Sequence, residues 1–434
     1  MPQMPRISHS VPKQLAWNTS AQIAARGISA LTTLLMTIFI ARHFGANGYG
    51  DFVKITTYIA FFYLLADFGF NAVYLQRTPL SAGTDENIND SAWEDLLELR
   101  ITVGCLLVII AGASAFILPQ GPAGGYTRFV QLGILLFAPS ILFQAMITSA
   151  NALFQKYLRY DLSTVAVTIG SCISLLLVIL VTQGIIPGNT ILYSTTALLV
   201  GAAATALISL YLTRRLQITH YSSVSWVRIR SLFIEGLPLG VTLLFNLVYF
   251  RIDSVILTIT RSTAEVGIYG LAYKVFELPL VLPTFFMNAL YPMMLRITQN
   301  TFSEERSLRD VVFKSSAFLF LTSLIVFIIV WIGAPIVGFI KNDFVPAIAV
   351  LRILIIGLPF FFLSSLTMWT LIAHKRQKML AAIYGISMVL NVVLNALFIP
   401  RFGYIAAAWI TVISEGFVLL VSGIAVIPLL HKGK

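Results

Sequence analysis

The sequence predicts an all-α membrane protein with twelve transmembrane helices. Composition is the first reason: 58% of residues are hydrophobic, 11% are charged and the mean hydropathy is +0.88, whereas about a quarter of residues in soluble domains are charged. Apolar runs recur along the whole chain, and each is long enough for a crossing, which takes roughly 20 residues. Runs such as 173–181 and 318–330 also lack the period-two alternation of membrane β-strands, which favours helices.

The apolar runs place the twelve crossings in order. They cover residues 15–41, 52–76, 99–118, 129–153, 162–183, 190–212, 232–258, 266–294, 312–340, 346–373, 379–399 and 404–430. The first run is too long for a signal-peptide core and lacks an Ala-x-Ala site at its end, so we expect it to remain as an anchor. Ser91-x-x-Glu94 has the pattern of a capping box and marks the start of the third helix. Cys105 and Cys172 fall inside spans, so neither a disulfide framework nor a metal site is expected.

The distribution of positive charge predicts the orientation. If the N-terminus is cytoplasmic, most of the 29 Lys and Arg residues lie in inner segments. This positive-inside bias predicts that both termini are cytoplasmic. The net charge of +11 has the same origin, because inner loops meet anionic lipid headgroups. We therefore expect membrane lipids, and not nucleic acid, as partners of these basic segments.

An internal repeat divides the chain into two halves. Matching residues stand 220 positions apart: Tyr49-Gly50-x-x-x-Lys54 with Tyr269-Gly270-x-x-x-Lys274, Pro139 with Pro359, and Lys156 with Arg376. With six spans per half, both halves have the same orientation, which predicts a pseudo-two-fold axis along the membrane normal. The expected domains are an N-terminal six-helix bundle (1–213), a basic cytoplasmic linker (214–230) and a C-terminal six-helix bundle (231–434).

Charged residues within the spans are the candidate functional residues. Each Asp, Lys or Arg at a helix centre costs about 2.5–3.5 kcal/mol, so these groups persist only when they are paired or face water. Eight positions stand out: Arg26, Asp67, Glu235, Arg251, Asp253, Lys274, Glu277 and Glu415. Arg26 and Asp67 lie at similar depth and are expected to pair, either structurally or as part of a binding site.

The remaining charges allow two arrangements. An Asp253–Lys274 pair leaves Arg251 available to a ligand; alternatively, Lys274 pairs with Glu277, three residues on. Glu235 and Glu415 lie near enough to helix ends for snorkelling or water access to suffice.

These charges predict a site for an anionic, phosphate-bearing cargo, because guanidinium forks match phosphate geometry and lysine supplies compact charge. The expected substrate-binding cations are Arg26, Lys54, Arg251 and Lys274. The expected counter-charges or ion-coupling groups are Asp67, Asp253 and Glu277. For the two lysines, which lie close to the outer surface, interfacial anchoring is the alternative. Aromatic residues that either pack or stack on sugars are Tyr58, Tyr249, Tyr273 and Trp369. No catalytic or metal-binding residue is expected, because the five histidines lack metal-ligand spacing and there is no P-loop.

Three short motifs resemble those of lipid-linked oligosaccharide flippases, the polysaccharide-export branch of the multidrug/oligosaccharidyl-lipid/polysaccharide exporter superfamily. They are Gly48-Tyr49-Gly50, Ala66-Asp67-Phe68-Gly69-Phe70, and Phe344-Val345-Pro346-Ala347 followed by Leu351-Arg352-Ile353-Leu354. The resemblance covers nearly the whole chain. It implies two six-helix bundles in a V shape around a central cavity, in a bacterial or archaeal cytoplasmic membrane.

The resemblance also implies a function: alternating-access transfer of an undecaprenyl-pyrophosphate-linked oligosaccharide from the inner to the outer leaflet for surface polysaccharide assembly. It implies no cofactor, energy from a Na⁺ or H⁺ gradient or the membrane potential, and other polysaccharide assembly proteins as partners. Alternatives are an exporter of lipid II or of drugs, a passive scramblase, and a polytopic lipid-sugar enzyme. Lipid II flippases usually have fourteen helices, and Arg26 fits an anionic cargo better than a cationic drug.

Overall fold

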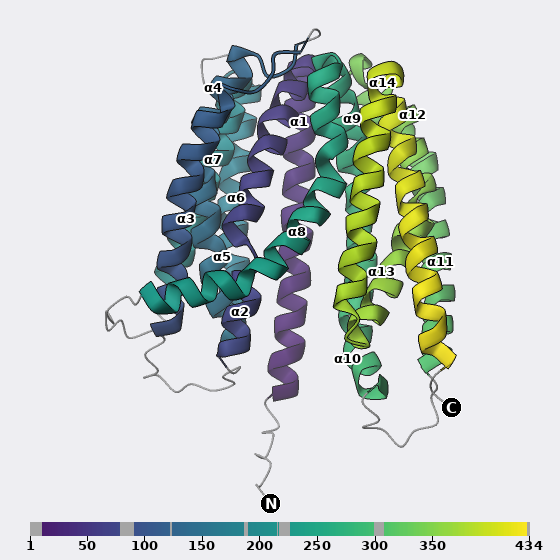
Figure 1. Ribbon diagram of the computed structural model, residues 1–434. Coiled ribbons are helices and arrows are strands. Elements are labelled where there is room, and N and C mark those ends of the chain that lie inside the picture. Colours follow the sequence, from purple (N-terminus) through teal and green to yellow (C-terminus); the bar gives the residue numbers. More distant parts are fainter. Residues whose placement is uncertain are drawn as a thin grey trace, which may run out of the picture. The chain divides into compact units, whose positions relative to one another are not determined.

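Helices make up nearly all of the described chain. The computed structural model describes residues 11–78, 91–121, 124–185, 190–214, 216, 226–298 and 308–431. In chain order the elements are α1 (Val11–Asp67), α2 (Phe70–Arg77), α3 (Ser91–Ala115), α4 (Arg128–Phe137), α5 (Ser140–Lys156), α6 (Tyr160–Thr182), α7 (Ile191–Arg214), α8 (Trp226–Thr260), α9 (Thr263–Glu277), η1 (Leu278–Leu280), α10 (Val281–Thr298), α11 (Leu308–Gly333), η2 (Ala334–Phe339), η3 (Asn342–Phe344), α12 (Ala347–Ile356), α13 (Leu358–Ala373) and α14 (Gln377–His431) (Figure 1).

Ten helical stretches within the described ranges are long and apolar enough to cross a membrane. Two of them are far too long for one crossing: α1 has 57 residues and α14 has 55. At about 1.5 Å per residue, each is more than twice as long as the roughly 30 Å hydrocarbon core is thick. Each therefore accounts for two of the predicted crossings, 15–41 with 52–76 and 379–399 with 404–430. The predicted all-α polytopic membrane fold is confirmed.

A glycine interrupts each of these two long helices. Gly45 in α1 has φ 70° and ψ −171°, and Gly403 in α14 has φ 64° and ψ −148°. This backbone region is essentially restricted to glycine. A side chain would also have no room, because a Cβ atom would lie 2.6 Å from the Asp343 carboxylate at Gly45 and 2.5 Å from the Glu265 carboxylate at Gly403. These glycines therefore mark the turns between paired crossings.

Proline interrupts the helical stretches at matching places in the repeat. Pro139 separates α4 from α5, and Pro359 lies in the first turn of α13, just after α12 ends. Proline has no backbone N–H and fits the first turn of a helix, where that donor is not needed. The 220-residue offset thus has a counterpart in the helices themselves, while the pseudo-two-fold axis stays a prediction.

The chain divides into two compact units. Unit 1 comprises Met1–His43, Ile55–Leu118 and Thr127–Leu244, and unit 2 comprises Phe44–Lys54, Pro119–Tyr126 and Phe245–Lys434. Both α1 and α8 contribute residues to both units. The predicted linker, 214–230, lies mostly outside the described residues, so the predicted domain boundaries stay a prediction.

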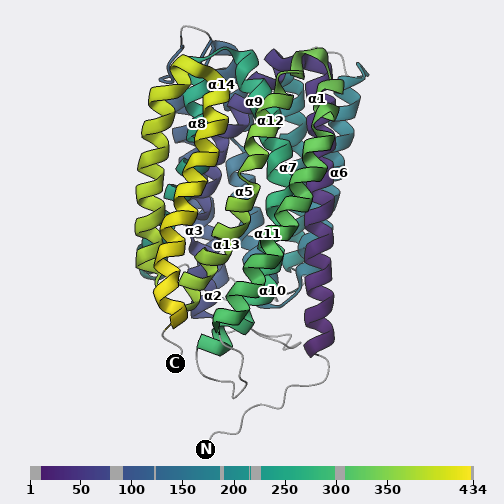
Figure 2. The same ribbon diagram turned by 90° about the vertical axis from the view of Figure 1, so that its right-hand side faces the viewer.

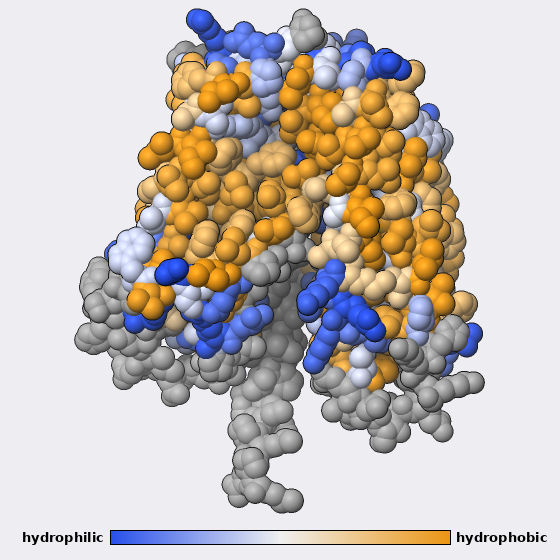
Figure 3. Space-filling model, viewed as in Figure 1, coloured by the Kyte–Doolittle hydropathy of each residue, from blue (hydrophilic) through white to orange (hydrophobic). Residues whose placement is uncertain are grey.

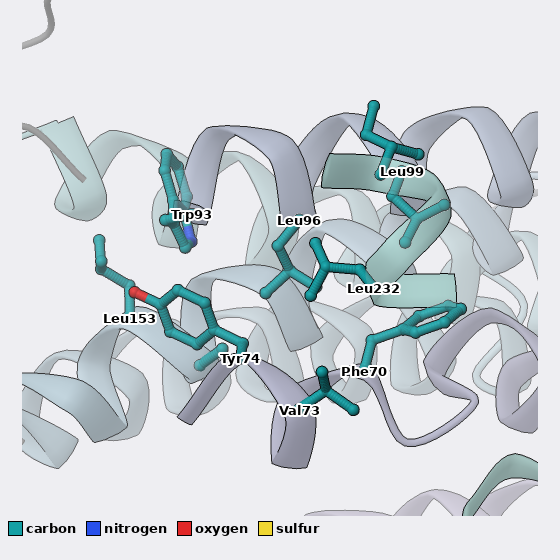
Figure 4. Packing of buried hydrophobic residues seen from close by; sticks show 10 residues of the cluster. Phe70, Val73, Tyr74, Trp93, Leu96, Leu99, Leu153 and Leu232 are labelled. Atoms are coloured by element: carbon teal, nitrogen blue, oxygen red, sulfur yellow. The ribbon is translucent and has the colours of Figure 1, made fainter. Parts of the chain in front are cut away.

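In unit 1, a hydrophobic cluster joins four helices. Phe70 of α2, Leu96 of α3, Leu153 of α5 and Leu232 of α8 are all almost fully buried in it. Figure 4 shows Leu96 and Leu232 lying between the rings of Phe70 and Tyr74. The cluster fixes α2 and the first part of α8 against α3 and α5.

In unit 2, α13 packs against α10, α11 and α14 (Figure 2). The outward side chains of α11 and α14 are strongly apolar, for example Phe313 at 76%, Ile332 at 72% and Leu420 at 62% exposed. Figure 3 shows hydrophobic residues predominating over the middle of α14 and hydrophilic residues near helix ends. Soluble proteins rarely expose such continuous apolar surface, so these faces contact lipid.

The two copies of the repeated Tyr-Gly motif pack against each other within unit 2. A Cβ atom at Gly50 of α1 would lie 2.0 Å from the Thr263 carbonyl oxygen, and one at Gly270 of α9 would lie 2.7 Å from the side chain of Val53. A Cβ atom at Gly267 would likewise lie 2.1 Å from the Ala46 carbonyl oxygen. Small residues allow membrane helices to approach at backbone distance, which explains glycine at both repeat positions.

Gly50→Ala is expected to destabilise the protein by about 1–3 kcal/mol, the usual cost of overpacking, because the new methyl group would collide with backbone atoms of α9. Thermal unfolding of the purified protein in detergent measures the change. The matched control is Gly423→Ala in α14, where nothing lies within 4 Å of the added Cβ atom, so it should be neutral. Equal stability of the two variants would contradict the close contact.

Candidate functional site

A buried ion pair lies where the first long helix ends in unit 1. Asp67 is the last residue of α1, and Arg100 of α3 donates to its carboxylate. Arg100 also donates to Asn71 at 2.9 Å. The Arg100 side chain is completely buried, whereas that of Asp67 is 33% exposed. One arginine thus neutralises the carboxylate and fixes the start of α2.

The helix break beside this pair is strained and held by aromatic packing. Phe68 has φ 37° and Gly69 has φ 76°, and a left-handed conformation costs a non-glycine residue about 1–2 kcal/mol. The Phe68 ring stacks on Phe233 of α8, with centroids 6.3 Å apart and an interplanar angle of 11°. Gly240 of α8 leaves room for it, because a Cβ atom there would lie 2.4 Å from the Phe68 ring. Residues of α8 therefore stabilise the break.

Sequence reasoning expected Arg26, and not Arg100, as the partner of Asp67. The side chain of Arg26 lies outside the described residues, so that pair stays a prediction, but the partner that the structure gives Asp67 is Arg100. Arg100 was overlooked because the third span was placed at 99–118, which put Arg100 at the membrane surface. The helix begins at Ser91, where the capping-box pattern predicts its start. Extending the span to that signal would have placed Arg100 inside it.

Unit 2 contains a cluster of two cations around one carboxylate. Arg251 of α8 donates to Glu277 of α9 at 2.7 Å, and Lys274 donates to the same carboxylate at 3.3 Å. The guanidinium of Arg251 also lies over the Tyr273 ring, 5.5 Å from its centroid. The side chain of Arg251 is 30% exposed, that of Lys274 is 35% exposed and that of Glu277 is 27% exposed. The cluster thus brings two cations to one carboxylate, is partly accessible, and has a further carboxylate, Asp253, that attracts Arg251 electrostatically.

The expected Asp253–Lys274 pair is wrong. Asp253 is 4% exposed and accepts hydrogen bonds from the Tyr269 hydroxyl and from the Ser254 amide. Lys274 pairs with Glu277, which was the alternative arrangement. Residues two apart on a helix point in different directions, so Asp253 and Arg251 meet different neighbours on α9. Arg251 is consequently bound to a carboxylate and not left free.

A second buried carboxylate in unit 2 was also misjudged. Glu415 of α14 is 3% exposed and accepts hydrogen bonds from the Tyr249 hydroxyl, at 2.9 Å, and from Ser364. It does not rely on snorkelling, because it lies well inside the helix. Glu235, in contrast, pairs with Arg77 and is 52% exposed. The tyrosine hydroxyl groups that bind Asp253 and Glu415 lie on other helices, so the sequence around each acid does not predict these partners.

Lys54 lies in unit 2 and is completely buried. Its ammonium donates to the Gly125 carbonyl at 2.9 Å and to the Thr263 hydroxyl at 2.6 Å, and it lies 3.7 Å from Asp51. Complete burial excludes the interfacial-anchor alternative. Through these contacts the ammonium of Lys54 links α1 to the segment before α4 and to the start of α9.

The four aromatic residues that were expected either to pack or to stack on sugars all make contacts within the protein. Tyr249 and Tyr273 are buried, and the Tyr58 hydroxyl hydrogen-bonds to Ser114 at 2.7 Å. Trp369 of α13 stacks on Tyr291 of α10, with centroids 4.8 Å apart. Most of this set therefore contributes to packing.

Comparisons with known proteins decide the family. The sequence profile described as polysaccharide biosynthesis protein matches residues 13–298, well over half of the chain. The chain belongs to the polysaccharide biosynthesis protein family. A second profile, MatE, matches residues 238–397 of this polysaccharide biosynthesis protein. No curated protein matched the sequence of this chain.

Solved structures similar to this family member share its fold. The lipid II flippase MurJ, in an inward closed conformation, has a TM-score of 0.73 at 17% identity over 94% of this chain and 88% of MurJ. An inward-facing multidrug resistance transporter of the MATE family has 0.72 at 13% identity, over 95% and 98% of the two chains. A MOP superfamily transporter from Pyrococcus furiosus Vc1 has 0.61 at 13% identity, over 96% of each chain.

The family and the fold together define the broad class. This member of the polysaccharide biosynthesis protein family is a multi-pass membrane protein. The predicted architecture of two six-helix bundles is confirmed by the fold that it shares with MurJ and the MATE transporters.

Asp67→Asn is expected to destabilise the protein by about 3 kcal/mol. Removing one partner of a buried pair costs about 3–5 kcal/mol, and the 33% exposure of Asp67 places the cost at the low end. Denaturation in detergent, followed by tryptophan fluorescence, measures it. Glu235→Gln breaks an exposed pair and serves as the control, with a loss below about 1 kcal/mol. If both variants lose the same free energy of unfolding, burial does not make the Asp67–Arg100 pair more stabilising than the exposed Glu235–Arg77 pair.

Proposed function

We propose that this transporter moves an undecaprenyl-pyrophosphate-linked oligosaccharide from the inner to the outer leaflet by alternating access, for surface polysaccharide assembly. Membership of the polysaccharide biosynthesis family supports a lipid-linked sugar as cargo. The cluster of Arg251, Lys274 and Glu277 in unit 2 supports an anionic head group.

The two cations of this cluster are the main support. Charged side chains within membrane spans are rare and mark substrate or ion pathways. Arg251 and Lys274 share the Glu277 carboxylate, and Asp253 also attracts Arg251 electrostatically. A pyrophosphate offers acceptor oxygens to the guanidinium fork of Arg251 and to the ammonium of Lys274, so it would compete with these carboxylates for the two cations.

Partial exposure is the second support. All three side chains remain about one-third exposed, so an incoming phosphate can reach them without unfolding the helices. Glu277 would act as the internal counter-charge that the phosphate displaces or shares. Arg26, in the N-terminal half, is proposed as a further substrate-binding cation.

Asp253 and Glu415 are proposed as the groups that couple transport to a Na⁺ or H⁺ gradient. Both are buried carboxylates bound by neutral hydroxyl or amide groups. A buried acid whose hydrogen-bond donors are neutral favours binding a proton or a metal cation. In unit 1, Asp67 is proposed as the counter-charge of Arg100.

Arg251→Gln and Lys274→Gln are each expected to reduce transport by roughly tenfold or more, because a hydrogen bond to a charged group is worth about 1.5–3 kcal/mol. The measurement is movement of a fluorescent lipid-linked sugar across the bilayer of reconstituted proteoliposomes. Lys314→Gln, which removes an exposed lysine of α11 in the same unit, is the matched control and should transport normally. If the cluster variants retain wild-type rates, the phosphate assignment is wrong.

Asp253→Asn and Glu415→Gln are expected to abolish the response of transport to an imposed Na⁺ or H⁺ gradient, because the amides cannot bind or release a proton and carry no charge. The same vesicles, prepared with and without each gradient, provide the measurement. Asp310→Asn removes an exposed carboxylate of α11 and should leave the response intact. Gradient-independent equilibration by the wild-type protein would indicate a scramblase instead.

A further inference from the structure

Arg352 of α12 stands apart from the other charged residues in the membrane spans. It lies within the stretch Asn342–Ala373, which is apolar enough to cross the membrane. Lys54, Arg100, Arg251 and Lys274 each lie within ion-pair distance of a carboxylate. No ion pair or hydrogen bond joins Arg352 to any residue in the described ranges.

The contact that Arg352 does make is with an aromatic ring. Its guanidinium lies over Trp331 of α11, 5.1 Å from the ring centroid. Its Nε atom is buried and has no acceptor among the described residues. Arg100 also leaves Nε without an acceptor, but its other nitrogens bind Asp67 and Asn71. A guanidinium has five N–H donors and does not lose its charge, so Arg352 has no anionic partner within the described part of the chain.

The surroundings of this pair show where the anion would come from. Trp331 is 39% exposed, and the neighbouring Ile332, Ile336 and Phe339 are 72%, 67% and 85% exposed. Such a surface faces acyl chains and not water. Arg352 lies about 8 Å along α12 from its first residue, Ala347, at about 1.5 Å per residue, a distance that a long side chain and a lipid head group can bridge near the interface.

We propose that Arg352 and Trp331 form a binding site for the phosphodiester of an anionic membrane phospholipid, such as phosphatidylglycerol. The guanidinium fork would bind two phosphate oxygens, the lipid charge would balance the cation, and Trp331 would hold the guanidinium in place by cation–π attraction. The acyl chains would cover the apolar side chains of α11 and η2. This site is separate from the Arg251 cluster and does not depend on the transported cargo.

Lipid retention by the purified full-length protein tests the proposal. After delipidation in detergent, the protein is mixed with phosphatidylglycerol or phosphatidylcholine, and bound lipid is counted by native mass spectrometry, with thermal stability as a second readout. Wild type should retain phosphatidylglycerol preferentially. Arg352→Gln should weaken that retention by roughly tenfold, and Arg352→Lys, which keeps the charge but not the fork, should fall between. Inorganic phosphate should give no stabilisation, because it lacks the acyl chains.

The matched control is Arg401→Gln, which removes an exposed arginine of α14 and should keep the preference for phosphatidylglycerol. Unchanged retention in Arg352→Gln would overturn the proposal, as would an equal loss in Arg401→Gln, which would indicate general attraction to positive charge. Transport is not part of the readout, so the result does not depend on the function proposed above. If Arg352→Gln does not fold, Arg352→Lys and Trp331→Leu decide the matter, since both should weaken retention.

Discussion

The cost of placing charge in hydrocarbon governs the arrangement of this protein. An unpaired ion at membrane depth is so unfavourable that each buried charge must find a partner or face an aqueous or ionic ligand. Arg100 therefore neutralises Asp67 in unit 1, and Lys54 is surrounded by oxygen atoms in unit 2. Helix breaks and close helix contacts occur where these partners have to meet.

Opposite charges and hydroxyl groups meet this constraint in both units. Unit 1 contains ion pairs such as Asp67 with Arg100 and Asp95 with Arg228. In unit 2, Arg251 and Lys274 share the Glu277 carboxylate, whereas Asp253 and Glu415 accept hydrogen bonds from tyrosine hydroxyl groups.

Much of the fold follows from the sequence, because hydrophobic length and the positions of glycine and proline act locally. Pro139, Pro359 and the repeated Tyr-Gly motifs all mark structural features where the sequence predicts them. Charge partners were harder to predict, because they depend on which helices are neighbours. Counting depth along single helices suggested Arg26 for Asp67 and Lys274 for Asp253, whereas packing supplies Arg100 and Tyr269. The Arg251–Glu277 contact also depends on how α8 and α9 pack.

The mixed composition of the units has a consequence for biogenesis. Residues 44–54 and 119–126 are synthesised with the first half but belong to the second unit, where Lys54 binds Thr263. During translation this lysine must therefore enter the bilayer well before its hydroxyl partner leaves the ribosome. The complete set of contacts around Lys54 therefore forms only after α9 has been synthesised.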